Sequence, residues 1–265
     1  MTLPAERDLR RGLYLAPFDQ LADPRTLVEL AVAAEANGWD GVFLWDHILW
    51  RPPVRAVADP WIALSAIAAH TERIRLGPLV TPLSRRRVHK LARETATLDE
   101  LSGGRLILGV GLGSSGNGEL ERFGEVVDPR ERAHRLDDGL ARLNQFWAGE
   151  FEPRPVQQPR VPIWVAARWP NRRPIRRAAR WDGIFPIELT GPEALAELVD
   201  AITRQRPDES GPFDVAVDLD PDTEIAPWQE AGATWILTDF GPQPQVERVL
   251  DVIEHGARDT NREHR

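Results

Sequence analysis

The sequence contains no cysteine among its 265 residues and only one lysine, Lys90. The absence of cysteine excludes disulfides, thiolate nucleophiles and cysteine-based zinc sites. No apolar run approaches the ~20 residues of a membrane span, and the N-terminal segment is charged where a secretory signal would be apolar. We therefore expect a protein that is neither exported nor embedded in a membrane, with the cytoplasm as its default location.

Charge and histidine spacing narrow the possible partners. The net charge is −8, from 41 acidic and 33 basic residues, so the overall field repels nucleic acid and anionic membranes. We expect a small-molecule partner. A metal-dependent hydrolase is a further alternative, but the histidines show neither H-x-H nor H-E-x-x-H spacing, so no metal site is expected. The six histidines are His47, His70, His89, His134, His255 and His264.

The chain alternates between short apolar runs and helical stretches. This alternation predicts parallel strands joined by helices. The expected strands are 12–17, 41–46, 73–80, 105–112, 162–167, 183–188, 213–219 and 234–239. Eight such units without a long interruption favour an α/β fold, a (β/α)₈ TIM barrel with short loops, over an open doubly wound sheet. We expect one domain over 1–265, with 1–11 and 257–265 as mobile tails.

Local sequence marks where helices begin and end. Asp23-Pro24, Asp59-Pro60 and Asp128-Pro129 each offer a carboxylate cap followed by a proline in the first turn. Asn37-Gly38 and Ser102-Gly103-Gly104 supply residues that tolerate the left-handed conformation at helix ends. The first helix has an apolar stripe at helical spacing. Its residues are Leu27, Leu30, Ala31 and Ala34.

Catalytic groups of such barrels lie at the C-terminal ends of the strands and in the loops that follow them. Asp46 and His47 come at the end of the second expected strand. An acid-histidine pair can be merely structural, but this position favours a catalytic role, because histidine exchanges protons near neutrality. Other polar residues at strand ends are Ser114, Asn117, Arg168, Glu188 and Asp239.

Residues 109–118 read GVGLGSSGNG and contain a literal G-x-G-x-x-G. A dinucleotide fingerprint would lead straight into a helix and be followed by an acid ending the next strand, whereas an irregular segment follows here. Glycine-rich backbone at a strand end still lets a planar ring or a phosphate approach closely. The alternative is an ordinary flexible turn.

Arginines cluster between 168 and 180. Arg168, Arg172 and Arg173 follow the fifth expected strand, where guanidinium groups can hold a phosphate. For the rest of the cluster a solvated surface is the favoured interpretation. These residues are Arg176, Arg177 and Arg180. Trp45, Trp50 and Trp169 lie near strand ends and are compatible with either an apolar pocket or core packing.

Four segments together resemble the bacterial luciferase-like monooxygenase superfamily, including its coenzyme F420-dependent branch. They read GWDGVFLWDHI, TERIRLGPLVTPL, LARETATLDELSGGRLILGVGLG and VPIWVAARWP, and the resemblance covers most of 12–190. It implies a (β/α)₈ barrel that binds FMN or F420 at its C-terminal mouth and uses the reduced ring to oxygenate or reduce a small organic substrate. Such an enzyme is an oxidoreductase. Dimers are common among relatives, so a homodimer is an open possibility.

The resemblance also assigns roles. It implies that His47 hydrogen-bonds the ring or substrate and relays a proton, and that Asp46 orients His47. It implies a bulge near Pro78 and Leu79 behind the ring, which in the family often contains a non-prolyl cis peptide. It places the remaining cofactor contacts on the glycine loop and on the end of the fifth strand. These residues are Gly109, Gly111, Gly113, Ser114, Ala166, Ala167 and Arg168.

The chain departs from the family pattern in two respects. F420-dependent dehydrogenases of sugar phosphates carry a glutamate after the strand-four glycines, where this chain has Ser114. The loops at 147–162 and 218–228 are also short, and short loops shield a site less well from water. A trimmed, non-catalytic flavin-binding or scaffold barrel is therefore kept as the alternative function.

Overall fold

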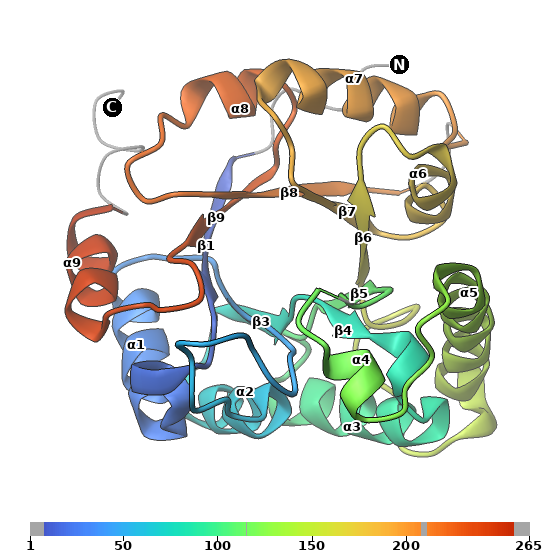
Figure 1. The fold of residues 1–265 in the computed structure, drawn as a ribbon, viewed down its shortest axis with the longest axis horizontal. Coiled ribbons are helices and arrows are strands. Elements are labelled where there is room, and N and C mark those ends of the chain that lie inside the picture. The colour runs from blue at the N-terminus through green and yellow to red at the C-terminus, as the bar shows by residue number, and fades with distance from the viewer. Residues whose placement is uncertain (1–7, 115, 208–210, 257–265) are drawn as a thin grey trace.

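The computed structural model describes residues 8–114, 116–207 and 211–256. Within these ranges nine parallel strands form one sheet. They are β1 Arg10–Leu15, β2 Gly41–Leu44, β3 Arg75–Pro78, β4 Thr81–Pro82, β5 Leu108–Gly111, β6 Ile163–Arg168, β7 Gly183–Ile187, β8 Asp214–Leu219 and β9 Trp235–Asp239. The strands surround a central space and the helices lie outside them, as Figure 1 shows, so the expected barrel architecture is confirmed.

Helices of different lengths lie around the sheet, and α4 lies at its C-terminal mouth. They are α1 Pro24–Ala36, α2 Pro60–His70, α3 Val88–Leu101, α4 Glu119–Arg122, α5 Pro129–Gln145, α6 Arg172–Ala178, α7 Pro192–Thr203, α8 Ala226–Glu230 and α9 Val246–Gly256. Short helical turns occur at η1 Asp19–Ala22, η2 Leu83–Arg85 and η3 Phe146–Glu150. None of the helices in the described ranges has the length and apolarity that crossing a membrane requires.

The expected caps are present. Asp23, Asp59 and Asp128 each accept a backbone hydrogen bond from the first turn of α1, α2 and α5, respectively, and each of these helices has a proline in that turn. Each carboxylate satisfies an amide that has no partner within its helix. The stripe predicted on α1 is buried against the sheet and its neighbours. The Asp-Pro pairs thus marked three helix starts correctly.

The third expected strand, 73–80, is divided into β3 and β4. The chain turns between them at a cis peptide bond that joins Leu79 and Val80. This is the non-prolyl cis bond that the family resemblance implied, next to the expected bulge. One predicted strand therefore gives two short ones, which accounts for the ninth strand.

The barrel closes between β3 and the segment that leads into β5. Leu76 pairs with Leu106, and the amide of Ile107 donates to the carbonyl of Leu76 at 2.9 Å. Gly77 permits this contact, because a Cβ at this position would lie 1.8 Å from the carbonyl oxygen of Ile107. The closure depends on a position that has no room for a side chain.

Aromatic side chains fill the inside of the barrel below its C-terminal mouth. The ring centroids of Phe43 and Trp164 lie 5.1 Å apart, and Trp235 lies 5.4 Å from Trp164. All three are buried. A second and larger core lies between the sheet and the helices. The inside of the barrel is therefore packed at this level, and the cavity at the C-terminal ends of the strands lies above the aromatic side chains.

Of the expected tails, 1–7 and 257–265 lie outside the described residues. Arg10 and Arg11 already belong to β1, where they pair with Trp235 and Ile236 of β9. Part of the segment that was expected to be a mobile tail is therefore a strand.

Candidate active site

A cavity of about 520 Å³ opens at the C-terminal ends of the strands. Most of the residues predicted for the site line it. They are Asp46, His47, Leu79, Gly111, Gly113, Ser114, Ala166, Ala167 and Arg168. Pro78 and Gly109 are not among the lining residues. A Cβ on Gly109 would lie 2.5 Å from the carbonyl oxygen of Pro78, so this glycine allows β5 to pass close behind the bulge.

His47 is held by a glutamate that the sequence analysis did not identify. Its Nδ1 atom lies 2.6 Å from Oε2 of Glu119, whose side chain is fully buried. The other oxygen of Glu119 accepts a hydrogen bond from Arg85. A carboxylate oxygen is an acceptor, so Nδ1 of His47 is the donor in this pair. The Nε2 atom is then left for exchange with a bound molecule.

Asp46 does not orient His47, contrary to the expectation. Its carboxylate bonds to Arg85 at 2.9 Å, to Arg86 at 2.7 Å and to the Thr81 hydroxyl at 2.7 Å. Burial acts to raise the pKa of Asp46, but the charges of Arg86 and Arg85 and the bond from Thr81 outweigh it, so the pKa is lowered. Asp46 therefore fixes the arginine that in turn holds Glu119.

Tryptophan side chains enclose the imidazole. The ring of Trp50 lies 4.6 Å from that of His47, and Trp45 lies 6.0 Å away. Both tryptophans line the cavity, whereas Trp169 lies elsewhere. An apolar surround limits the water that reaches His47 and strengthens its polar contacts.

Another part of the wall is made of small and apolar groups. Leu79 and Val80, on either side of the cis bond, face the cavity together with Gly111 and Ala166. A Cβ on Gly111 would lie 2.8 Å from the Val80 side chain. This wall can accept a flat apolar ring system without polar groups that compete for it.

The arginine cluster is divided between the barrel cavity and the outer surface of α6. Arg168 lines the cavity and pairs with Glu188 at 2.9 Å. Arg177 also lines the cavity but is buried and bonds to Asp137 at 2.7 Å, so the expectation of a solvated side chain is wrong for this residue. Burial raises the pKa of Asp137, but its bond from Arg177 lowers it by more.

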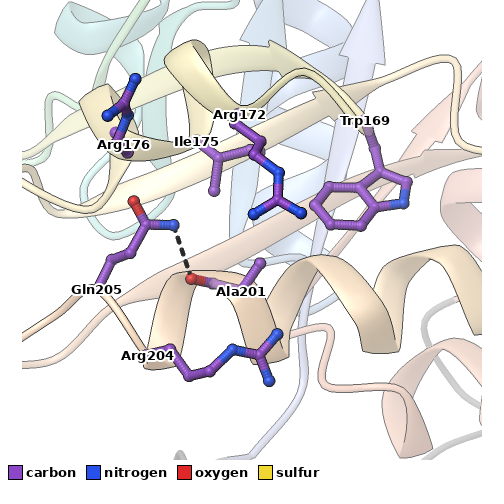
Figure 2. Close-up of a pocket in the computed structure, with 7 residues that line it drawn as sticks. All are labelled: Trp169, Arg172, Ile175, Arg176, Ala201, Arg204 and Gln205. Carbon is purple, nitrogen blue, oxygen red and sulfur yellow. Dashed lines mark hydrogen bonds between the residues drawn. The ribbon is translucent and has the colours of Figure 1, made fainter.

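A second cavity of about 460 Å³ lies outside the barrel, between α6 and α7. Figure 2 shows three guanidinium groups around it, from Arg172 and Arg176 of α6 and from Arg204 just after α7. Neither a carboxylate nor an imidazole is among the residues that line it. This groove, which we call the arginine groove, offers a place for an anion but not for acid-base chemistry.

Two further groups of the barrel cavity escaped the sequence analysis. Tyr14 of β1 and Asp218 of β8 line it together with Asp239, which had been noted only for its place at a strand end. Tyr14 and Asp218 stand inside strands, where only the alternation of inward and outward positions could have marked them. Glu119 follows the glycines in a segment interpreted as an irregular link.

Among the described residues no group of three potential metal ligands comes together.

Comparisons with known proteins agree with this geometry. The chain is 29% identical over 92% of its length to an F420-dependent glucose-6-phosphate dehydrogenase of Nakamurella multipartita, covering 88% of that protein. It is 31% identical over 94% of its length to the enzyme of the same name from Beutenbergia cavernae, covering 89% of it.

Solved structures share the fold at lower identity. An F420-dependent secondary alcohol dehydrogenase in complex with an F420-acetone adduct matches with a TM-score of 0.78 at 16% identity, over 94% of this chain and 98% of that one. A monooxygenase from Streptomyces bottropensis matches with a TM-score of 0.75 at 20% identity, again over 94% and 98%. A profile of the luciferase-like monooxygenase family matches residues 6–224. The chain therefore belongs to the luciferase-like monooxygenase family.

Proposed function

We propose that this protein is an oxidoreductase that uses reduced FMN or coenzyme F420 to oxygenate or reduce a small organic substrate. The observation that carries the proposal is the buried chain of contacts from His47 through Glu119 to Arg85 in the wall of the barrel cavity. Family membership supports the same function.

The residues present fit a flavin-like group. The cavity has the size of small-molecule and cofactor sites, which are about 300–1,000 Å³. Leu79, Val80 and Ala166 would support the ring system. Gly113, Ser114 and Arg168 would hold the phosphate, since they combine exposed backbone with a guanidinium group at the mouth.

When bound, the cofactor supplies hydride transfer or oxygen activation, and the protein supplies orientation and proton handling. His47 can accept a proton at Nε2 from a substrate hydroxyl or return one, because its Nδ1 atom is already engaged by Glu119. Trp45 and Trp50 restrict water around the imidazole. Asp46 acts through Arg85 and is a positioning residue rather than a proton donor.

The catalytic interpretation is favoured over a scaffold. A protein that only displayed a cofactor would have no need for an imidazole fixed by a buried carboxylate in the cavity wall. The short loops that motivated the scaffold alternative leave this arrangement intact.

Titration of the purified protein with FMN and with F420, followed by tryptophan fluorescence, tests the proposal. Saturable binding of at least one is expected. Reduced-cofactor oxidation, with oxygen or menadione as acceptor, should exceed the rate of the free cofactor. His47→Asn should lower that excess by about 10²-fold or more.

The matched control is His255→Asn, because His255 is exposed on α9 and lies outside the cavity. Its rate should equal that of the parent protein. Failure to bind either cofactor would overturn the proposal. Rates at the free-cofactor background in both the parent and the His47 variant would establish the scaffold instead.

A further inference from the structure

The wall opposite the bulge carries negative charge. Asp218 and Asp239 come from the neighbouring strands β8 and β9, and Tyr14 comes from β1 on the other side of β9. Tyr14 and Asp239 are paired in register. All three line the cavity. We call these three residues the acidic wall.

Within the part of the chain that the structure describes, the acidic wall has no ion-pair partner, unlike the other acids at the site. Asp46 is neutralised by two arginines, and Glu188 pairs with Arg168. Among the described residues, no other side chain bonds to Asp218, and the Asp239 carboxylate is bonded by backbone amides alone, those of Gly241 at 2.9 Å and Phe240. Burial, and then the charge of a neighbouring aspartate, raise the pKa of each to about 6. A pair of ionisable groups is left without a partner at the place where a substrate would lie.

The tyrosine gives a second and independent indication of a ligand. Tyr14 is 8% exposed, and its hydroxyl has no hydrogen-bond partner in the part of the chain that the structure describes. Buried polar groups are nearly always paired. The neighbouring Trp45 has a buried indole N–H that is likewise without a partner in the described part. Both residues line the same cavity, and the Tyr14 hydroxyl is the group that a bound polar molecule can reach.

A purely structural role explains these groups poorly. Two carboxyl groups that stabilised the sheet by sharing a proton would be hydrogen-bonded to each other, and no such bond joins Asp218 and Asp239 among the described contacts. Unpaired buried carboxylates cost stability. Such a cost is typical of groups retained for binding.

We infer that the acidic wall binds the ammonium group of a cationic organic substrate and disfavours phosphate esters. The inference rests on the proposed function and names the substrate class of the same site. Two carboxylates attract a cation, and the Tyr14 hydroxyl can accept a hydrogen bond from it, whereas a phosphate dianion would be repelled. The related dehydrogenases are named for glucose 6-phosphate, so this chain would differ from them in its substrate.

Three probes of one shape test the inference: benzylammonium, benzyl alcohol and benzyl phosphate. Their binding is measured calorimetrically at pH 8, with and without a saturating cofactor. Benzylammonium should bind about tenfold more tightly than the alcohol. With the cofactor bound, so that its own phosphate fills the phosphate site, benzyl phosphate should not saturate. Asp218→Asn and Asp239→Asn should each remove most of that preference while changing the affinity for the alcohol less than about twofold. Tyr14→Phe should weaken the ammonium more than the alcohol.

The matched control is Asp200→Asn, at an exposed position on α7 that lies outside the cavity, and it should leave all three affinities unchanged. Equal binding of alcohol and ammonium, tighter binding of the phosphate, or a preference that survives in the double Asp218 and Asp239 variant would overturn the inference. The two failures are distinguishable, because ammonium binding is measured without cofactor as well. If a cofactor binds but ammonium is not preferred over alcohol, only this inference is wrong. If ammonium is preferred but neither cofactor binds, only the proposed function is wrong.

Discussion

The Nδ1 atom of His47 lies 2.6 Å from Oε2 of Glu119, a residue 72 positions further along the chain. This contact joins the loop after β2 to α4, which follows β5. Glu119 also bonds to Arg85 in the turn after β4, and Arg85 bonds to Asp46 beside His47. One buried carboxylate, that of Glu119, thus connects three loops of the barrel mouth. Glu119 therefore supports both the shape of the cavity and the orientation of the His47 imidazole.

We expect Glu119→Gln to reduce stability as well as activity. The variant keeps the size of the side chain but leaves Arg85 without one of its two ion pairs, and breaking a buried pair costs about 3 kcal/mol. Urea unfolding measures the loss. Glu121→Gln, at an exposed position on the same short helix, is the control and should change stability by less than about 0.5 kcal/mol. A loss as small at Glu119 would contradict the buried ion-pair geometry.

The fold was largely predictable because its determinants are local. Proline after aspartate marked the starts of α1, α2 and α5, and alternation of apolar runs with helices indicated parallel strands. The division of the third strand at Leu79 was not readable from local pattern alone, since an apolar run has the same appearance whether or not its backbone turns. Only the family resemblance pointed to it.

The site was predictable only in part. Strand-end position placed Asp46 and His47 at the cavity, because all parallel strands end at the same mouth. Which carboxylate contacts the imidazole depends on side-chain directions across distant loops, and sequence adjacency pointed to Asp46 where the fold uses Glu119. Asp218 and Tyr14 were missed because an inward position within a strand cannot be told from an outward one without its register.

Gly77→Ala should destabilise the protein strongly. The new Cβ would lie 1.8 Å from the carbonyl oxygen of Ile107, at the contact that closes the barrel, and backbone on both sides leaves little room to relax. We expect a loss of about 3 kcal/mol or more, measured by thermal or urea unfolding. Gly211→Ala is the matched control, because a Cβ there meets nothing within 4 Å. Equal stability of the two variants would show that the barrel does not close at Gly77.

Asp218 and Asp239 should make stability depend on pH. Their pKa values are raised to about 6, so the folded protein holds protons that the unfolded chain has already released. Stability contributed by these groups is therefore greatest near pH 4, falls as pH rises through 6 and is lowest above 7. Asp218→Asn and Asp239→Asn remove this loss and should each be more stable than the parent by about 2 kcal/mol at pH 8, with little difference near pH 4.

The measurement is the difference in unfolding free energy between variant and parent at several pH values, which cancels groups that titrate equally in both. Asp200→Asn should show a difference that does not vary with pH, because Asp200 is exposed. A stabilisation of the Asp218 variant that was the same at pH 4 and pH 8 would show that its carboxyl is not perturbed in the folded state.

The arginine groove offers a way to tell the two cofactors apart. Both FMN and F420 carry a phosphate, but only F420 continues into a tail with further carboxylates. Arg172 and Arg176 lie just past Arg168 along the chain, and no acidic partner is recorded for either among the described residues. If that tail follows the groove, the double variant Arg172→Ala with Arg176→Ala should weaken the binding of F420 by about tenfold and that of FMN by less than about twofold. Added salt should reduce the difference.

Arg173→Ala is the control, since Arg173 lines a different groove of α6. Equal losses for both cofactors would instead place the shared phosphate in this groove, and no loss for either would separate it from cofactor binding.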